Sequence, residues 1–463
     1  MGIDLSGQDI MPKAGWITIE IKNSHPLIQL ARVLPWPTLI DLVVKDLKNT
    51  TAKGCWWMGR KIKVRMHLGA YLLQRLYNLT DRKLEYQLKD NAAFQLFCGL
   101  GIVHGWHAPD HTKIECFRGR LTPETHRQLT NLISQTAVSL GFADPRDIDF
   151  DSTVQEANIS YPSDARLMSH LAGIGKKVVD FTRDKLKLRD AKDITVDMTA
   201  VKKSAREYFF LAKNKGIEIK RSVFKKLHKL VKQEMRPVLD LCGMLTETQI
   251  AKLPWNIRRA FDTLKNDAWR YLLDVGHFTR THTIKAGKLL SFHAKELACI
   301  SKGKLGKDKE FGRAFQLGRI GGNLMIVLES TSVMMNDRKS FIPFLKEHQT
   351  IFGEGVLTKV ATDKGYWSSK NKRALEELGL TTAGFQKPGK LKEGIIDIGL
   401  KEDLQNRRAG IEPLIGHIKR GGQLGKSRMK SDAATLAAGY GSVLGFNLRQ
   451  VIRHQQGKMR VAA

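Results

Sequence analysis

The chain has 463 residues, which suggests two or three domains, and its 42% apolar content excludes a chain disordered along its whole length. Lysine and arginine number 77 against 46 acidic residues, so the formal net charge is +31 and we expect a polyanionic partner, most simply nucleic acid. No apolar run reaches the roughly 18 residues of a membrane span, and five scattered cysteines without a signal sequence favour the cytoplasm over an exported, disulfide-bonded class.

The N-terminal region divides into two parts of different character. Residues 1–60 are mixed and leave their structure uncertain, whereas residues 61–140 predict short basic helices. Residues 61–77 have helical periodicity, residues 81–90 follow a capping residue, and a third helix opens at Pro109. This pattern suits a helical DNA-binding domain, although a plain helical bundle with a solvated basic face has the same pattern.

Within the segment 147–154, β-branched and aromatic residues around Asp151 predict a short strand that ends in its carboxylate. The chain then returns to a mainly helical pattern over residues 161–305, which we interpret as an insertion. Lysine-rich helices are expected at 176–189 and 221–235. Their lysines either clamp DNA or form a solvated face, and the sequence leaves both alternatives open.

Two tryptophans of the insertion, Trp255 and Trp269, lie in or beside a further helix predicted at residues 257–274. Tryptophan can stack on an unpaired base, which would suit a DNA-binding protein. Packing in the core is the interpretation that we favour for both residues.

The rest of the chain alternates strands and helices. Together with residues 141–160, residues 306–455 predict a mixed α/β core in which helices flank a mixed sheet. Gly321-Gly322 lies between two apolar runs and indicates a two-residue hairpin. The predicted strands cover 311–320, 323–330, 356–362 and 381–386, and the predicted helices cover 337–348, 366–378, 401–420 and 432–453.

Three acidic residues stand out in this basic chain: Asp151 and Asp363 at predicted strand ends, and Glu412 beside basic residues. Cutting or joining a phosphodiester needs a nucleophilic oxygen and neutralised charge, which two Mg²⁺ ions about 4 Å apart supply. Mg²⁺ prefers carboxylate ligands, so such a site needs acids from different elements. An isolated aspartate at a strand end is typically a turn or cap residue. Asp149 competes with Asp151 because both point to one face of the strand, and we favour Asp151.

The three segments DSTVQEANISYPSDA, ATDKGYWSSKN and RRAGIEPLIGHIKR resemble the three motifs of DDE transposases, in particular the IS-five-like branch of insertion sequences. Arg408, Glu412 and Lys419 match the family's Y-x₂-R-x₃-E-x₆-K signature, with Gln405 at the tyrosine position. The N-terminal segments MHLGAYLLQRLYNLTDRKLEYQL and PDHTKIECFRGRL also resemble the family. The resemblance extends over residues 60–455, and it implies an RNase H-like core with a large helical insertion and an all-α N-terminal domain.

The resemblance also implies a function. Asp151, Asp363 and Glu412 would hold Mg²⁺, for which Mn²⁺ can substitute, and would catalyse strand cleavage and strand transfer at the inverted repeats of an insertion sequence. The implied partners are double-stranded DNA at the element ends and the target, a second copy of the chain in the active complex, and no membrane. The implied location is the bacterial cytoplasm, at the nucleoid. The residues expected to contact DNA are Arg408, Lys419, Arg407, Lys364 and Tyr366.

Pro413 bears on whether the third motif forms one surface. A continuous helix would put Arg408, Glu412 and Lys419 on one face, because they are spaced by four and seven residues. A proline inside a helix either kinks it or marks its first turn. If the helix restarts near Pro413, Arg408 belongs to a preceding element.

Two rival functions share these features. A non-transposing nuclease on the same fold would keep the acidic residues but would not need to pair element ends. A catalytically inactive DNA-binding derivative would have lost one of the acids, and Asp151, Asp363 and Glu412 are all present. Short inverted repeats flanking the gene would separate a transposase from a nuclease.

Overall fold

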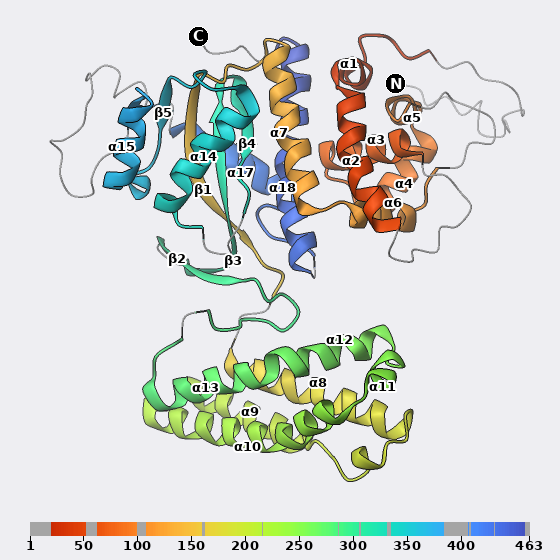
Figure 1. Cartoon of the computed structure of the whole chain (residues 1–463), viewed down its shortest axis with the longest axis vertical. Helices are drawn as coiled ribbons and strands as arrows, with labels where there is room; N and C mark the ends of the chain where they lie inside the picture. Colours follow the sequence, from red (N-terminus) through yellow and green to blue (C-terminus); the bar gives the residue numbers. More distant parts are fainter. Residues whose placement is uncertain are drawn as a thin grey trace, which may run out of the picture.

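The computed structural model describes residues 20–51, 63–99, 108–159, 163–214, 216–285, 287–304, 307–330, 335–383, 406, 409–429 and 431–458. Figure 1 shows a group of N-terminal helices beside a sheet flanked by helices, and a helical bundle below the sheet. The fold is mixed α/β, as the sequence predicts.

The N-terminal helices begin where the sequence places capping side chains. The Thr80 hydroxyl accepts a hydrogen bond from the Lys83 amide at 3.3 Å, and the Asp110 carboxylate accepts one from the Lys113 amide at 2.9 Å. Each cap satisfies an amide that the first helical turn leaves without a partner. The helices are α1 (Pro26–Val33), α2 (Trp36–Thr51), α3 (Val64–Leu76), α4 (Asp81–Asp90), α5 (Ala92–Phe97) and α6 (His111–Arg120).

Within the described residues, no single helix is long and apolar enough to cross a membrane. Helices α1 and α2 together reach that length and hydropathy, but they are bent by 74° relative to each other.

The sheet has six strands, in the order β2-β3-β1-β5-β6, with β4 also paired to β3. The long strand β3 is antiparallel to β1, β2 and β4, whereas β1, β5 and β6 run parallel. The sheet is therefore mixed, as expected, although β2 was not anticipated from the sequence. The strands are β1 (Asp147–Glu156), β2 (Ala298–Lys304), β3 (Lys307–Ile320), β4 (Leu324–Val327), β5 (Lys359–Ala361) and β6 (Thr381–Ala383).

The connection between β3 and β4 is a three-residue turn, so the expected two-residue hairpin is wrong. The turn η3 covers Gly321–Asn323, and Gly322 has a φ of 74°, a backbone region that favours glycine. A Cβ at Gly322 would lie 2.0 Å from the carbonyl oxygen of Phe142. The close approach of the preceding loop, which the local sequence does not reveal, therefore sets the geometry of this turn.

Helices cover both faces of the sheet. Phe150 of β1 packs against Phe341 and Phe344 of α14 (Asp337–Phe352), on the face whose apolar cluster continues into the N-terminal helices. Leu317 of β3 belongs to a second cluster with Ile415 of α17 (Ile411–Arg420) and residues of α18 (Asp432–Gln455). A last helix, α15 (Ser369–Glu377), lies between β5 and β6 in the chain.

Two asparagines cover the free edge of β4. Asn131, on α7 (Pro123–Ser139), accepts a hydrogen bond from the Val327 amide at 2.9 Å. Asn447, on α18, accepts one from the Met325 amide at 3.0 Å and donates one to the Met325 carbonyl at 2.7 Å. These side chains take the place of a further strand, so α7 and α18 satisfy a sheet edge that would otherwise be open.

The helical insertion has a hydrophobic cluster of its own. At its junction with the core, the Lys288 ammonium lies 2.5 Å from the Asp164 carboxylate, and the Tyr271 hydroxyl lies 3.3 Å from the same carboxylate. Asp164 is thus held in a partly buried ion pair. The helices are α8 (Asp164–Asp184), α9 (Met198–Asn214), α10 (Ile217–Met244), α11 (Glu247–Ala251), α12 (Trp255–Thr263) and α13 (Trp269–Thr281).

Candidate active site

Asp151 lies in the middle of β1, not at its end as the sequence suggested. The strand is longer than expected because it pairs with β3 as far as Glu156. Its pairing with β5 ends at Asp149, which lies opposite Ala361. Asp151 is therefore beyond the last paired residue of β5, at the level where Asp363 follows the end of that strand.

Asp149 is buried and paired, whereas Asp151 is half-exposed. The Nε of Arg319 donates to the Asp149 carboxylate at 2.6 Å, and both side chains are largely shielded from solvent. Arg319 lies directly opposite Asp149 on β3. The carboxylate of Asp149 therefore neutralises a buried cation inside the sheet.

Asp363 begins a tight turn that contains a buried tyrosine. Its carboxylate accepts a hydrogen bond from the Lys364 amide at 2.5 Å, and its carbonyl accepts one from the Tyr366 amide at 3.1 Å. The turn, η4 (Lys364–Tyr366), exposes the Lys364 side chain and buries Tyr366 completely. Because Tyr366 does not face solvent, we assign it an internal role in place of the expected contact with DNA.

A chain of polar side chains holds Tyr366 in place. The Tyr366 hydroxyl donates to the side-chain carbonyl of Gln316 on β3, and the Gln316 amide donates to Asp337 at 2.8 Å. The Asn371 amide donates to the Tyr366 carbonyl at 2.8 Å and to the Arg338 carbonyl at 2.8 Å. Gln316 is fully buried. These bonds fix the turn after Asp363 to β3 and to the first turn of α14.

Three carboxylates act on Tyr366. Burial raises the pKa of its hydroxyl well above the usual value, and the charges of Asp337, Asp151 and Asp363 raise it further. Asp337 also lies against the turn, since a Cβ at Gly365 would be 3.2 Å from its carboxylate. The charges of Asp151 on β1, of Asp363 after β5 and of Asp337 on α14 therefore all act on Tyr366.

Sequence reasoning missed Gln316 and Asp337. Asp337 occupies the first turn of a predicted helix, where an acid is ordinary. Gln316 carried a usable signal, because it stands between Phe315 and Leu317 in an apolar strand and a buried amide needs partners.

Glu412 lies in the first turn of α17, on the sheet face opposite to α14. The helix begins at Ile411, so Pro413 stands in the first turn, which is the second of the two alternatives. Asp151 faces the same side of the sheet as α17, because its partner Leu317 belongs to the apolar cluster that includes Ile411. Glu412 is exposed and Lys419, seven residues later on the same face of the helix, is half-buried.

The remaining basic residues of the third motif, Arg407 and Arg408, lie outside the described residues, as does Gln405.

The described residues contain no group of three His, Cys, Asp or Glu side chains that could hold a metal ion. Asp151 and Asp363 approach the same tyrosine, while Glu412 does not complete a three-ligand group with them. The residues still suit Mg²⁺, because this ion takes hard oxygen ligands and commonly binds through one or two carboxylates together with water and substrate phosphates.

Comparisons with known proteins point to DNA transposition. Residues 17–120 match the model of a family described as Transposase domain (DUF772). An uncharacterized protein, ORF8 in the nfe locus of Rhizobium meliloti, is 26% identical over 153 residues, which are 32% of this chain and 69% of the relative. No solved structure matches the chain significantly. The family match supports an insertion-sequence transposase, and it covers the N-terminal helices rather than the sheet that carries the acidic residues.

Proposed function

We propose that the chain is a DDE transposase of the IS-five-like kind, with an RNase H-like core that cleaves and joins DNA at Asp151, Asp363 and Glu412. The proposal rests mainly on the positions of two of these acids in the sheet. Two of these acids, Asp151 and Asp363, come from adjacent parallel strands and reach the same level beyond the end of β5. The transposase domain match in the N-terminal helices supports the same function independently.

The carboxylates of Asp151 and Asp363 would hold divalent cations, with Glu412 as the third acid. Bound Mg²⁺ would lower the pKa of an attacking water or 3′-hydroxyl and would neutralise charge that develops on the phosphate. The turn at Asp363 has little freedom, because the buried bonds of Tyr366 and Gln316 fix it. Such fixed positioning favours in-line attack, since the acids need not reorganise during the reaction.

The cations near the acids would contact phosphates. Lys364 is exposed directly after Asp363, and Lys419 follows Glu412 on one helix face. Arg407 and Arg408 precede α17, and the sequence signature gives Arg408 the same role. Arginine would bind a phosphate in bidentate fashion, and lysine would act as a point charge.

The test is the Asp363→Asn variant in an assay with Mg²⁺ and DNA that carries the element's own ends. We expect strand cleavage to fall at least about a thousandfold, because the amide cannot replace a charged metal ligand, while DNA binding persists. Asp190→Asn is the matched control, because Asp190 is exposed in the insertion. Cleavage by the Asp363→Asn variant at the rate of the unmodified chain would refute the assignment.

The same assay separates the rival functions. A transposase joins the freed 3′ ends to target DNA, whereas a non-transposing nuclease on the same fold stops after cleavage. An inactive derivative binds the ends and cleaves nothing at any concentration of Mg²⁺ or Mn²⁺.

A further inference from the structure

Helix α10 of the insertion carries a straight row of cations. Its members are separated by four, four, three and four residues, a spacing that keeps them on one side of an α-helix. All are exposed. The row covers 15 residue steps, or about 22 Å at 1.5 Å per residue. The residues are Arg221, Lys225, Lys229, Lys232 and Arg236.

These cations form no ion pair inside the described part of the insertion. Among the described residues, none of them lies within ion-pair distance of an acidic side chain, although ion pairs occur on α8, α12 and α13. The acids of α10 do not neutralise the row. Glu234 accepts a hydrogen bond from the Asp197 amide. Glu218 and Asp240 lie about one turn before and one turn after the row, form no ion pair with it among the described residues, and Asp240 lines a hollow beside the row. A row of like charges without partners repels itself, which favours a role in association over a role in folding.

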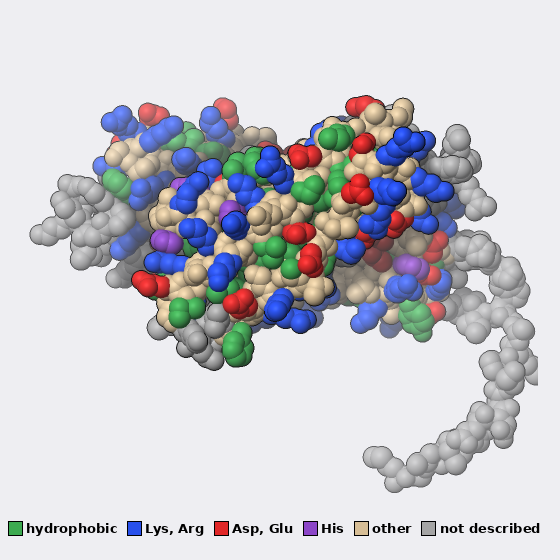
Figure 2. Space-filling model, turned by 90° about the horizontal axis from the view of Figure 1, so that it is seen from below, with side chains coloured by type: hydrophobic (Ala, Val, Ile, Leu, Met, Phe, Trp, Pro, Cys, Tyr) green, Lys and Arg blue, Asp and Glu red, His purple; other side chains and the backbone are tan. Residues whose placement is uncertain are grey.

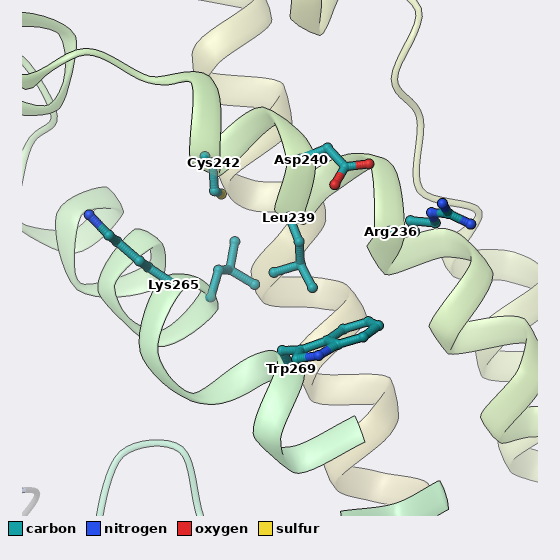
Figure 3. A pocket seen from close by; sticks show the side chains of 8 residues that line it. Arg236, Leu239, Asp240, Cys242, Lys265 and Trp269 are labelled. Atoms are coloured by element: carbon teal, nitrogen blue, oxygen red, sulfur yellow. The ribbon is translucent and has the colours of Figure 1, made fainter. Parts of the chain in front are cut away.

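A groove runs beside the row, between α10 and α13. It contains a hollow of about 350 Å³ lined by residues that include Arg236, Lys265 and Trp269, and a second hollow of about 120 Å³ lined by residues that include Lys232 and Arg280. Figure 3 shows the first hollow, with Leu239 pointing toward the Trp269 ring and with Arg236 and Lys265 on opposite sides. Trp269 lines both hollows.

The apolar floor of this groove is open to solvent. Trp269 is 47% exposed and Leu273, one turn further along α13, is 50% exposed. The Lys232 ammonium lies 5.6 Å from the centre of the Trp269 ring, a cation–π contact that orients this lysine over the groove. The turn before Trp269 is a π-helix, Leu264–Ala268, a form that is frequent at functional sites. The expectation that Trp269 packs in the core is therefore wrong, as it is for Trp255, which is 76% exposed.

We infer that this groove, with the α10 row along its edge, binds the phosphate backbone of double-stranded DNA. A row of about 22 Å matches about six base-pair steps of a duplex. Figure 2 views the molecule from the insertion side and shows Lys and Arg distributed over that face, with fewer Asp and Glu. The inference rests on the proposed function for the choice of polymer, and it adds a DNA contact on the insertion, far along the chain from the N-terminal helices and the acids.

The test neutralises four cations of the α10 row together in the full chain, of which Lys232 and Arg236 line the hollows. The changes are Lys225→Gln, Lys229→Gln, Lys232→Gln and Arg236→Gln. Fluorescence anisotropy with a labelled 30-base-pair duplex of unrelated sequence, without divalent metal, gives the Kd between 0.05 and 0.2 M salt. We expect the Kd at 0.1 M salt to rise at least about tenfold, and the slope of log Kd against log salt to fall by about 3.6, because each of the four lost phosphate contacts lowers it by about 0.9.

A second variant removes the same charge elsewhere on the insertion: Lys177→Gln, Lys202→Gln, Lys203→Gln and Arg206→Gln. These side chains are exposed on α8 and α9, outside the α10 row, and line neither hollow. We expect this variant to change the salt slope by less than about one. The single variants Lys232→Gln and Arg236→Gln, each expected to lower the slope by about one, repeat the test with a smaller change.

Three results would overturn the inference. Unchanged duplex binding by the α10 variant would exclude the contact. Equal weakening of binding in both four-charge variants would show that binding depends on the net charge of the chain and not on the position of the cations. Loss of binding to single-stranded DNA or to polyglutamate, with duplex binding intact, would assign the groove to another polyanion. Because no metal is present, these results do not depend on cleavage, so failure of the proposed function and failure of this inference remain distinguishable.

Discussion

The sheet and the helical insertion use basic residues in opposite ways. In the core, Arg319 is buried against Asp149 and Arg313 is buried against Glu296. In the insertion, the cations of the α10 row are exposed and form no ion pair among the described residues. The paired cations of the core are cancelled by their acids, so the net charge of +31 comes from cations in excess of the acids, and exposed cations such as those of α10 are suited to association. A paired, buried cation contributes little to binding, whereas an exposed unpaired one attracts a polyanion over a Debye length of about 10 Å.

The largest expected effects, on cleavage and on stability, come from substitutions of two nearby aspartates of β1. Asp151→Asn should lower cleavage at least about a thousandfold while the free energy of unfolding stays within about 1 kcal/mol, because Asp151 is half-exposed. Asp149→Asn should lower the free energy of unfolding by about 3 kcal/mol, because it leaves the buried Arg319 charge without its partner. Urea denaturation and the cleavage assay measure both quantities.

The reverse outcome would exchange the two residues. If Asp149→Asn removes cleavage without loss of stability, then Asp149 is the metal ligand. The buried pair of Asp149 and Arg319 would then contribute little to the free energy of unfolding.

The next effect tests how closely the core is packed. A Cβ at Gly445 of α18 would lie 2.1 Å from the Arg75 carbonyl oxygen on α3. Gly445→Ala should therefore force these helices apart and lower the free energy of unfolding by about 3 kcal/mol. Gly243→Ala in the insertion is the matched change, because a Cβ at Gly243 meets no atom within 4 Å. It should leave stability unchanged or raise it by up to about 1 kcal/mol, since alanine favours the helix.

Equal stability of these two alanine variants, measured by urea denaturation, would show that α18 can shift without loss. The core at Gly445 would then tolerate a methyl group as well as the insertion does at Gly243.

The smallest expected effect is a fall in the free energy of unfolding at low pH. Burial, with help from Arg75 and Arg118, lowers the pKa of His126 to about 3, and the Tyr71 hydroxyl lies 2.6 Å from its Nδ1. The unfolded chain binds this proton near pH 6.5, so the stabilisation is complete above that pH and is lost as the pH falls toward 3. We expect the free energy of unfolding to fall by about 2 kcal/mol from this group between pH 6.5 and 5.

His126→Gln should remove that part of the pH dependence, and His277→Gln, on the insertion, should leave it in place. Urea denaturation at pH 7.5, 6.5 and 5 measures the slope. An unchanged slope in His126→Gln would mean that His126 has the same pKa in the folded and the unfolded chain.

Local signals in the sequence predicted much of the fold. The helices after Thr80 and Asp110 were placed correctly because a cap depends on residues three positions apart. Strand β2 was missed because its sequence, ACISKGK, is polar and forms a strand only through its pairing with β3. The alternation of apolar and polar residues did not predict the length of β1 either, because that length depends on the strands that pair with it on each side.

The candidate site divides in the same way. Asp151 and Asp363 were found through motifs that are continuous in the chain. Gln316 and Asp337 act through hydrogen bonds between distant segments, such as the bond from Tyr366 to Gln316, which spans 50 residues. Nothing local distinguishes such a residue from an ordinary strand or helix residue until the fold is known.

The ion pair at the base of the insertion has a consequence for the speed of folding. Strands β1 and β3 are neighbours in the sheet, yet about 150 residues separate them in the chain. The insertion has its own hydrophobic cluster, and Lys288 holds its end against Asp164 at its beginning. Once the insertion has folded, the segments from Glu156 to Asp164 and from Lys288 to Lys307 close a loop of about 27 residues in place of about 150, which lowers the entropic barrier by about 1.5 kcal/mol. We therefore expect early folding of the insertion to accelerate the pairing that brings Asp151 into the sheet.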